Sequence, residues 1–456
     1  MRILLLHPPL AYRVPAAWRT ESLGLGYVGA ALRNDGHEVE VLDAHLRCLP
    51  ARKTVREILV RDFDCLGITA AQAHKDTLIP IVRAVRKRRK DAIIVAGGYL
   101  PTLAADQLLS FLPDLNFVVR GEGEQVIRDL CGRIDRGEDW RDTPGIGYLK
   151  DGQPVLNPVP TPVQDLDTLP FPIRDALGQA VLPVSPGVST NRGCYHRCSF
   201  CCVQSFFGLS ESRVPRFRSP GNTVDEIESV IAQTNMRTFN FVDDSFLGPG
   251  KKLHDRVTRL AEEIKSRKLK ITFTIQCRAD EVDDELLKLL KDVGLTDVFL
   301  GIESGVQRQL DTYNKHVTVE QNRQGIEIVR RSGVGLRSGF IIFDPYVTIP
   351  ELLENIQFAR ETGILEEAKK VPVPFLTPLI LHRGVPLVEQ LRADGLLREK
   401  GIDVDYVFKD RTVRLVFKIL LVLGVCTDFV KRFCRRKESD YLRPQTDLQQ
   451  TAAGEP

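Results

Sequence analysis

Three cysteines close together in the sequence have the spacing of a metal-binding loop. Cys194, Cys198 and Cys201 follow the pattern CxxxCxxC, directly after a short apolar run of strand-forming residues. Thiolates are soft ligands suited to zinc or to iron–sulfur clusters, and three of them in so short a stretch converge only if the backbone loops around one small group. The pattern therefore predicts a metal centre.

The number of cysteines favours a cluster over zinc. Structural zinc takes four protein ligands, usually as two separated pairs, whereas three cysteines leave one position open. Cys202 could supply a fourth thiolate, but the side chains of adjacent residues point apart. An open iron suits a redox cluster that also binds a substrate. Zinc, or a structural role without a metal, is the alternative.

With Phe200 just before the last cysteine, the motif resembles that of the radical S-adenosylmethionine superfamily, and most of the chain resembles the cobalamin-binding branch of that superfamily. The resemblance implies that the three cysteines hold a [4Fe-4S] cluster, that S-adenosylmethionine chelates its fourth iron, and that Phe200 lies beside these cofactors. It further implies a small-molecule substrate and an electron donor such as flavodoxin or ferredoxin.

The composition limits which partners and which cellular compartment are expected. The net charge of +3 gives no electrostatic reason to expect nucleic acid as a partner. Ten cysteines are present, and most of those outside the motif are scattered singly, which predicts free thiols in a reducing, cytoplasmic compartment. The first apolar run is too short for a signal peptide, and no stretch reaches the roughly 18 apolar residues of a membrane-spanning helix.

Residues 1–145 predict the first domain, because apolar runs alternate there with amphipathic segments. Such an order gives a parallel, doubly wound sheet with helices on both faces, a Rossmann-like α/β fold. Ligands of such sheets bind beyond the carboxyl ends of the strands. The expected strands are Ile3–Leu6, Glu38–Leu42, Cys65–Thr69, Ala92–Ala96 and Phe117–Arg120.

A glycine motif in this domain, Gly24-Leu25-Gly26-Tyr27-Val28-Gly29, has the GxGxxG form of nicotinamide-binding folds, and Asp43 stands where a dehydrogenase has its acid. In those folds the glycines directly follow the first strand, so that the start of the helix touches the pyrophosphate. Here a loop from Pro8 to Ser22 intervenes. Nicotinamide binding is therefore the less favoured alternative.

The resemblance assigns the same sheet to cobalamin. By that resemblance, Thr69, Gly97, Gly98 and Thr102 line the tunnel for the nucleotide tail, and the loop Leu23–Tyr27, which includes Gly26, faces the corrin ring. Glycines at strand ends permit positive φ and a close approach of the backbone to a ligand. Ordinary turn glycines are the alternative.

One departure concerns the lower face of the corrin. Cobalamin proteins that replace the lower base with a histidine usually show DxHxxG after the first strand, and this chain has no such motif there. Asp43-Ala44-His45 has the first three letters, but it follows the second strand and lacks the glycine. The resemblance then implies base-off cobalamin without histidine ligation, a geometry that suits methyl chemistry on the upper face.

Several prolines lie in residues 146–184 and predict an ordered linker, since proline cannot continue a long helix or a central strand.

In residues 185–385 strand and helix patterns alternate again, which predicts a partial (β/α)6 barrel of the TIM type with its site at the carboxyl ends of the strands. After the cysteine loop, the expected strands are Thr238–Val242, Thr272–Cys277, Asp297–Ile302, Gly335–Phe343 and Lys370–Val373.

The period-two alternation of strand side chains selects charged residues for the barrel lumen. In the strands that end near Arg278 and Glu303, the apolar residues share the face that should meet the helices, so Arg278 and Glu303 point into the lumen. By the same alternation, Asp244 rather than Asp243 faces inward. An unpaired charge in a lumen costs several kcal/mol and needs a partner or a ligand. The resemblance implies that Asp244, Arg278 and Glu303 hold S-adenosylmethionine. A mutual Arg278–Glu303 salt bridge is the alternative.

Residues 386–456 complete the chain. The segment Val413–Phe433 mixes apolar and basic residues and predicts a helical cap on the barrel, with contact to a membrane surface or to an apolar substrate as the alternative. From Glu438 onward the tail is polar, which predicts disorder.

Taken with the resemblance, these features predict a cobalamin-dependent radical S-adenosylmethionine enzyme. The resemblance implies that a 5′-deoxyadenosyl radical removes hydrogen from the substrate and that methylcobalamin supplies a methyl group. A methyltransferase acting on an unactivated carbon, or on a phosphinate, of a small biosynthetic intermediate is the main prediction. The alternatives are a radical cyclase or rearrangement enzyme, a non-catalytic cobalamin sensor, and a methylthiotransferase, for which Cys48, Cys65 and Cys131 are not suitably arranged.

Overall fold

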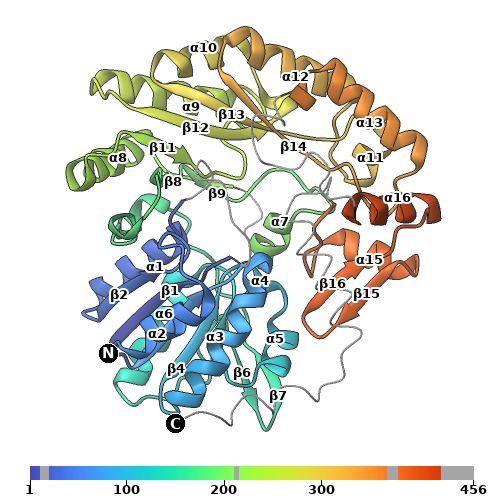
Figure 1. Cartoon of the computed structure of the whole chain (residues 1–456). Coiled ribbons are helices and arrows are strands. Elements are labelled where there is room, and N and C mark those ends of the chain that lie inside the picture. Colours follow the sequence, from blue (N-terminus) through green and yellow to red (C-terminus); the bar gives the residue numbers. More distant parts are fainter. Residues whose placement is uncertain (11–19, 210–214, 367–377, 423–456) are drawn as a thin grey trace.

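The structure is a computed structural model that describes residues 1–10, 20–209, 215–366 and 378–422, with side chains of the last helix described to residue 420. A seven-stranded sheet forms the first unit, in the order β2-β1-β3-β4-β5-β6-β7 (Figure 1). The first five strands are parallel, and β6 and β7 are antiparallel. The strands are β1 (Arg2–His7), β2 (Glu38–Asp43), β3 (Cys65–Thr69), β4 (Ile93–Gly97), β5 (Phe117–Val119), β6 (Ile146–Lys150) and β7 (Gln153–Leu156).

Alternate side chains of β1 explain why helices cover both faces of this sheet. Leu4 and Leu6 pack in one core with α2, α3 and α5, whereas Ile3 and Leu5 pack in another with α1 and α6. Successive strand residues point to opposite faces, so a fully apolar strand needs a cover on each side. The predicted doubly wound sheet is confirmed. The helices are α1 (Leu23–Asn34), α2 (Ala51–Leu59), the 3₁₀ turn η2 (Gln72–His74), α3 (Lys75–Arg88), α4 (Tyr99–Leu103), α5 (Ala105–Phe111) and α6 (Gly123–Asp135).

The first sheet extends beyond the predicted boundary at residue 145. Strands β6 and β7 form a hairpin within the range expected to be a linker. Asp151 and Gly152 make its two-residue turn, with φ angles of 51° and 77°. Pro154 is accommodated because β7 is the edge strand. The strap after the hairpin carries two short 3₁₀ turns, η3 (Leu166–Thr168) and η4 (Leu177–Gln179).

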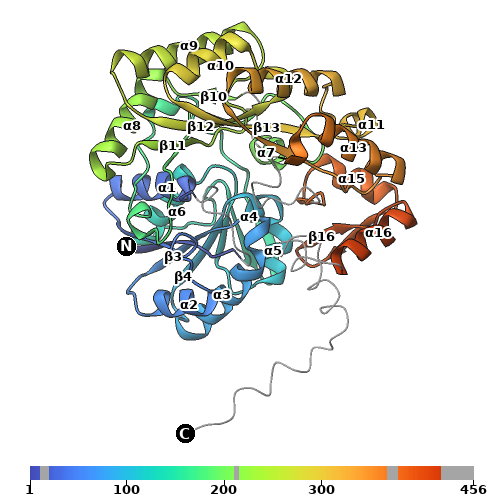
Figure 2. The ribbon, with the colours of Figure 1, turned by 45° about the horizontal axis from the view of Figure 1, so that its top comes forward.

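A second sheet, parallel throughout, has the order β14-β13-β12-β11-β8. Helices α8, α9, α10 and α12 cover its outer face (Figure 2). The described strands form an open part of the predicted barrel, and the expected strand at residues 370–373 lies outside the described residues. The strands are β8 (Gly187–Val188), β11 (Thr238–Phe241), β12 (Thr272–Arg278), β13 (Leu295–Glu303) and β14 (Gly335–Phe340), with a separate small ladder of β9 (Asn191–Arg192) and β10 (Arg216–Phe217). The helices are α7 (Cys202–Phe207), α8 (Pro220–Thr234), α9 (Lys251–Ser266), η5 (Ala279–Glu281), α10 (Asp284–Asp292), α11 (Gln307–Thr312), α12 (Val319–Ser332) and α13 (Ile349–Glu361).

The last described elements are α15 (Pro386–Ala393), β15 (Leu397–Lys400), β16 (Asp403–Tyr406) and α16 (Arg411–Val422). Helix α16 packs Val413 and Phe417 against Phe343, just beyond β14, and leaves Leu415 and Ile419 exposed. The described part of the predicted cap therefore does cover the end of the second unit. Among the described helices, none combines the length and apolar character of a membrane-spanning segment. Residues 423–456, with the predicted disordered tail, lie outside the described residues.

Candidate functional site

A cavity of about 540 Å³ lies where the carboxyl ends of the first sheet meet the second unit. Its lining comes from both sides, with Thr69 and Gly97 from the first sheet and Asn191 and Asp244 from the second unit. The short helix α7 adds Phe206. Of the site residues predicted in the second unit, Asp244 lines this cavity. Arg278, Glu303 and the three cysteines are not among its lining residues.

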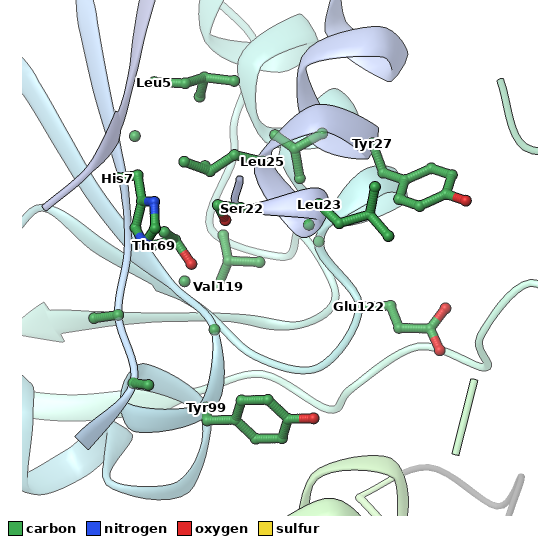
Figure 3. Close-up of a pocket in the computed structure, with 18 of the residues that line it drawn as sticks. Leu5, His7, Ser22, Leu23, Leu25, Tyr27, Thr69, Tyr99, Val119 and Glu122 are labelled. Atoms are coloured by element: carbon green, nitrogen blue, oxygen red, sulfur yellow. The ribbon is translucent and has the colours of Figure 1, made fainter. Parts of the chain in front are cut away.

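An apolar arm of the cavity runs along the first sheet. Figure 3 shows Leu5, Leu25 and Val119 turned toward this space. Gly67, in the middle of β3, keeps the arm open, because a Cβ at this position would approach Leu5 Cδ2 to 2.8 Å. Such an apolar slot fits a flat aromatic base. Gly67 was not among the predicted site residues, although a glycine inside an apolar strand signals a close approach of a ligand or backbone. The lining of this arm is Leu5, Leu25, Val28, Gly67, Val95, Val119 and Ile127.

Most residues predicted for the tunnel lie at the cavity. Thr69, Gly97 and Gly98 line it. Gly98 has a φ of 98°, and a Cβ there would lie 2.9 Å from the carbonyl oxygen of Ala70, so this position requires glycine. Thr102 lies behind the lining, where its hydroxyl accepts a hydrogen bond from the N–H of Gly121 at 3.1 Å. Thr102 therefore fixes the loop after β5.

Gly26 lies outside the cavity lining, which corrects the prediction that it faces the corrin. Its carbonyl accepts a hydrogen bond from the N–H of Ile173 at 3.1 Å, and a Cβ would lie 2.8 Å from Pro172 Cβ. The GxGxxG pattern thus lets α1 pack closely against the strap. Its neighbours Leu25 and Tyr27 do line the cavity.

Ion pairs close the wall between the two units. Arg192 donates to Glu122 Oε2 at 2.9 Å and to Glu124 Oε1 at 2.6 Å. The Arg192 guanidinium also lies 4.7 Å from the centre of the Tyr27 ring. Burial acts to raise the pKa of Glu124, but the charge of Arg192 outweighs it and holds this pKa below its ordinary value. The pairs fix the loop after β5 against β9.

The cysteine loop lies between β9 and α7 and carries half-buried free thiols at Cys194, Cys198 and Cys201. Burial raises the pKa of Cys194 to about 12, and it also raises the pKa of Cys198, against which Lys315 and Arg278 act. Arg278 Nη1 lies 3.8 Å from Cys198 Sγ. Within the described ranges, no three His, Cys, Asp or Glu side chains converge on a single ion. A cluster needs no such convergence, because each cysteine binds its own iron.

Contacts from α11 and η5 fasten the loop. The N–H of Ser199 donates to the carbonyl oxygen of Tyr313 at 2.8 Å, and His196 Nε2 lies 2.7 Å from Glu281 Oε1. The ring of Phe200 packs edge-to-face on Tyr313, with ring centres 5.3 Å apart. In the structure Phe200 thus anchors the loop next to Cys201.

Arg278 and Glu303 lie at the carboxyl ends of β12 and β13. The structure does not show the mutual salt bridge, since Arg278 pairs with Asp280 at 2.9 Å and Glu303 pairs with Lys315 at 3.0 Å. Glu303 has a φ of 64°, at a register shift between β13 and β14. Left-handed backbone is costly for a residue other than glycine and is found at functional sites.

Asp243 and Asp244 have different surroundings. Asp243 accepts hydrogen bonds from the N–H groups of Thr190 and Asn191, each at 2.7 Å, and is structural. Asp244 lines the cavity. Burial, with a smaller contribution from Asp243, raises the pKa of Asp244 to about 7. A perturbed carboxyl at a cavity wall is typical of a ligand-binding group.

The fold and the site together define an α/β enzyme with one cofactor region on each unit and a cavity that residues of both units line. On the first sheet, the apolar slot that Gly67 keeps open fits the tail of a large planar cofactor. On the second, three half-buried thiols share one loop, and the charges of Lys315 and Arg278 favour the thiolate form of Cys198.

Comparison with known proteins gives the family. The B12 binding domain family matches residues 11–131, and the radical SAM superfamily matches residues 188–359. The anaerobic magnesium-protoporphyrin IX monomethyl ester cyclase of Rubrivivax gelatinosus is 30% identical over 396 residues, which cover 82% of this chain and 69% of the cyclase. The cytidylyl-2-hydroxyethylphosphonate methyltransferase of Streptomyces wedmorensis is 25% identical, over 79% of this chain and 77% of that enzyme.

A solved structure shares the whole architecture. The cobalamin-dependent S-adenosylmethionine radical enzyme OxsB, with aqua-cobalamin and S-adenosylmethionine bound, superposes with a TM-score of 0.76 at 21% identity. The match covers 93% of this chain and 66% of OxsB. The chain belongs to the cobalamin-binding radical S-adenosylmethionine enzymes. Its cofactors are a [4Fe-4S] cluster, S-adenosylmethionine and cobalamin.

Proposed function

We propose that the protein is a methyltransferase that acts on an unactivated carbon, or on a phosphinate, of a small-molecule biosynthetic intermediate. The shared cavity carries this proposal, because one space is lined by Thr69 and Gly98 on the cobalamin side and by Asp244 on the other side. A methyl donor and a hydrogen-abstracting group must reach the same substrate atom, and a common chamber supplies that proximity. The resemblance to a phosphonate methyltransferase supports the proposal.

In this proposal residues 1–156 hold cobalamin, and residues 185–385 hold the cluster, through Cys194, Cys198 and Cys201, together with S-adenosylmethionine. When bound, the cluster and S-adenosylmethionine supply hydrogen-atom abstraction, and cobalamin supplies the methyl group. The chain has to exclude water from this chemistry. The rings of Tyr99 and Phe206, with centres 4.7 Å apart in the cavity wall, serve that purpose.

Charged residues of the second unit are assigned to S-adenosylmethionine. Arg278, which both oxygens of Asp280 hold in place, is suited to the carboxylate of the ligand. Glu303 and Asp244 are suited to its ammonium and ribose groups, since carboxylates accept hydrogen bonds from both.

The proposal includes an electron donor such as flavodoxin or ferredoxin and a reducing, cytoplasmic compartment. Reductive cleavage of S-adenosylmethionine needs an external electron. Buried Cys65, Cys131 and Cys277, away from the loop, are free thiols. Free thiols fit a reducing compartment.

Radical cyclisation is the second candidate. The observation that favours it is the 30% identity to the cyclase of Rubrivivax gelatinosus, over most of both chains. Cyclisation uses the same hydrogen-atom abstraction without net transfer of a methyl group.

The two candidates differ in their products. The protein is reconstituted without oxygen with iron, sulfide and hydroxocobalamin, and is incubated with a reductant, S-adenosylmethionine and candidate substrates. Methyl transfer yields 5′-deoxyadenosine and S-adenosylhomocysteine together with a methylated product, all measured by mass spectrometry. 5′-Deoxyadenosine with an altered substrate but no S-adenosylhomocysteine would contradict methyl transfer and support cyclisation. The Cys198→Ala variant is the control and yields neither product.

A further inference from the structure

Helix α16 has an uncovered face at the edge of the molecule, where Figure 1 and Figure 2 both show it. The opposite face is buried, since Val413 and Phe417 pack in one cluster with Phe343. On the outer face, Leu415 is 58% exposed and Ile419 is 47% exposed. Residues four positions apart are neighbours on a helix, so these two side chains form one exposed apolar pair.

Three basic side chains lie beside the exposed pair. Arg411, Arg414 and Lys418 are all exposed. At 3.6 residues per turn they fall on one side of Leu415 and Ile419, on the same outer half of the helix. The sequence of α16 holds no acidic residue that could neutralise them. The outer face therefore combines apolar and positively charged groups.

The packing of the inner face fixes which side chains point outward. The rings of Phe343 and Phe417 lie with their centres 4.9 Å apart. At the start of the helix, Asp410 Oδ1 accepts a hydrogen bond from the N–H of Thr412 at 2.7 Å, and the N–H of Lys409 donates to the carbonyl oxygen of Pro345 at 2.8 Å. Leu415 and Ile419 cannot turn inward without breaking these contacts.

Positive charge is concentrated in this part of the sequence. Between positions 411 and 437 the chain has eight arginines and lysines and one acidic residue, Asp428, although the net charge of the whole chain is only +3. The rest of the chain is therefore net negative. A basic segment of this kind, with apolar residues at helical spacing, is typical of a partner that is both apolar and negatively charged.

We propose that the outer face of α16 binds the surface of an anionic phospholipid bilayer. Leu415 and Ile419 enter the boundary of the acyl chains, and Arg411, Arg414 and Lys418 lie at the lipid phosphates. Apolar side chains gain by leaving water, basic side chains are attracted to anionic head groups, and the long stems of arginine and lysine reach from one region to the other. This contact is independent of the reaction proposed above.

Charge favours a bilayer over a second copy of the chain as the occupant of this face. In a symmetric dimer the same patch meets itself, so the basic residues of one α16 would face those of the other with no acidic residue of the helix between them. The contact is peripheral, because none of the described helices is long and apolar enough to cross a membrane.

Flotation of the full-length, cofactor-loaded protein with lipid vesicles tests the contact. Vesicles of phosphatidylcholine and phosphatidylglycerol in equal parts are the anionic probe, and vesicles of phosphatidylcholine alone are the neutral comparison. We expect the protein to float with the anionic vesicles at low ionic strength, and to do so much less at high ionic strength, because salt screens exposed charges. Flotation with neither kind of vesicle, or with both equally, would overturn the proposal.

Charge reversal in α16, with a matched reversal in α2, then locates the contact. The α16 variant is expected to bind anionic vesicles roughly 100-fold more weakly, since each basic residue near an anionic surface contributes about fivefold. The α2 variant changes the net charge by the same amount and is expected to bind as the unmodified protein does. Equal losses in the two variants would overturn the assignment to α16. The substitutions are Arg411→Glu, Arg414→Glu and Lys418→Glu in α16, and Arg52→Glu, Lys53→Glu and Arg56→Glu, also exposed, in α2.

Removal of the apolar pair is the second arm of the test. Leu415→Ser combined with Ile419→Ser is expected to weaken vesicle binding by roughly tenfold or more. Val181→Ser combined with Leu182→Ser, an exposed apolar pair after η4, is the control and is expected to change nothing. Retained iron and cobalamin show that each variant is folded. A dimer that dissociates in the α16 variant, with vesicle binding unchanged, would assign the face to a second copy and overturn the proposal.

Discussion

The two sheets present different chemistry at the carboxyl ends of their strands. The first offers an apolar slot whose width is set by Gly67, whereas the second offers charges, with Arg278 and Lys315 beside Cys198 and Glu303. An apolar slot selects its ligand by shape, and a charged site selects by complementary groups. This difference implies that cobalamin binding is separable from binding of S-adenosylmethionine and the cluster. A single substitution should therefore weaken one of the two and leave the other unchanged.

The largest effect is expected from a cluster ligand. Cys198→Ala removes one of three thiolates, and we expect loss of bound iron and a fall of S-adenosylmethionine cleavage to background, with cobalamin binding retained. Iron content and 5′-deoxyadenosine measure the two effects. Cys202→Ala is the matched control, because it removes the adjacent thiol outside the motif. Full iron content in Cys198→Ala would contradict the assignment of the cluster to this loop.

On the apolar side, Gly67→Val should have the next largest effect. The side chain would enter the slot, where a Cβ alone already lies 2.8 Å from Leu5 Cδ2. Overpacking costs about 1–3 kcal/mol, which corresponds to cobalamin binding weaker by roughly 10- to 100-fold. Cobalamin retention after gel filtration, together with iron content, measures the selectivity. Gly178→Val is the control, since that position has open space. Equal cobalamin retention in both variants would mean that the slot does not hold the nucleotide tail.

Glu303→Gln should weaken binding on the charged side only. The change removes the charge of a group that we assign to S-adenosylmethionine, and a hydrogen bond to a charged group is worth about 1.5 kcal/mol, or roughly tenfold in affinity. Titration calorimetry on the reconstituted protein measures S-adenosylmethionine binding. Glu354→Gln, on the exposed surface of α13, is the control. Unchanged affinity in Glu303→Gln would remove this residue from the site.

The smallest expected effect is a pH-dependent gain in stability from Asp244→Asn. In the folded protein the pKa of Asp244 is raised to about 7, so between its ordinary pKa and 7 the native state binds more protons than the unfolded state. The stability contributed by this group therefore falls as the pH rises toward 7. In cofactor-free protein we expect the variant to melt about 2–4 °C higher near pH 8, with a smaller gain near pH 5. An equal gain at both pH values, measured by thermal unfolding, would contradict the shifted pKa.

Local patterns were enough for much of the fold and for part of the site. The alternation of β12 requires only the geometry of one strand, in which Phe273, Ile275 and Cys277 are buried toward the helices and Arg278 reaches the cysteine loop. The cysteine spacing likewise depends on neighbours in the chain. The Asp151-Gly152 dipeptide favours a tight hairpin turn, so this turn could have been predicted. The nearby prolines instead led to the prediction of a linker.

Long-range packing accounts for what the sequence could not show. Gly26 was predicted to face the corrin, but the strap residues Pro172 and Ile173 pack on it, and nothing near Gly26 in the chain indicates that contact. Such residues acquire their roles only when distant segments meet.

The proposed arrangement brings two metal centres close together, with cobalamin in the cavity and the cluster at the cysteine loop. Its most direct test is pulsed electron paramagnetic resonance of the reconstituted protein, reduced so that the cluster and the cobalt each carry an unpaired electron. We predict a strong magnetic interaction between the two centres, which is absent in Cys198→Ala. Two non-interacting signals from a protein that retains both iron and cobalt would contradict the account.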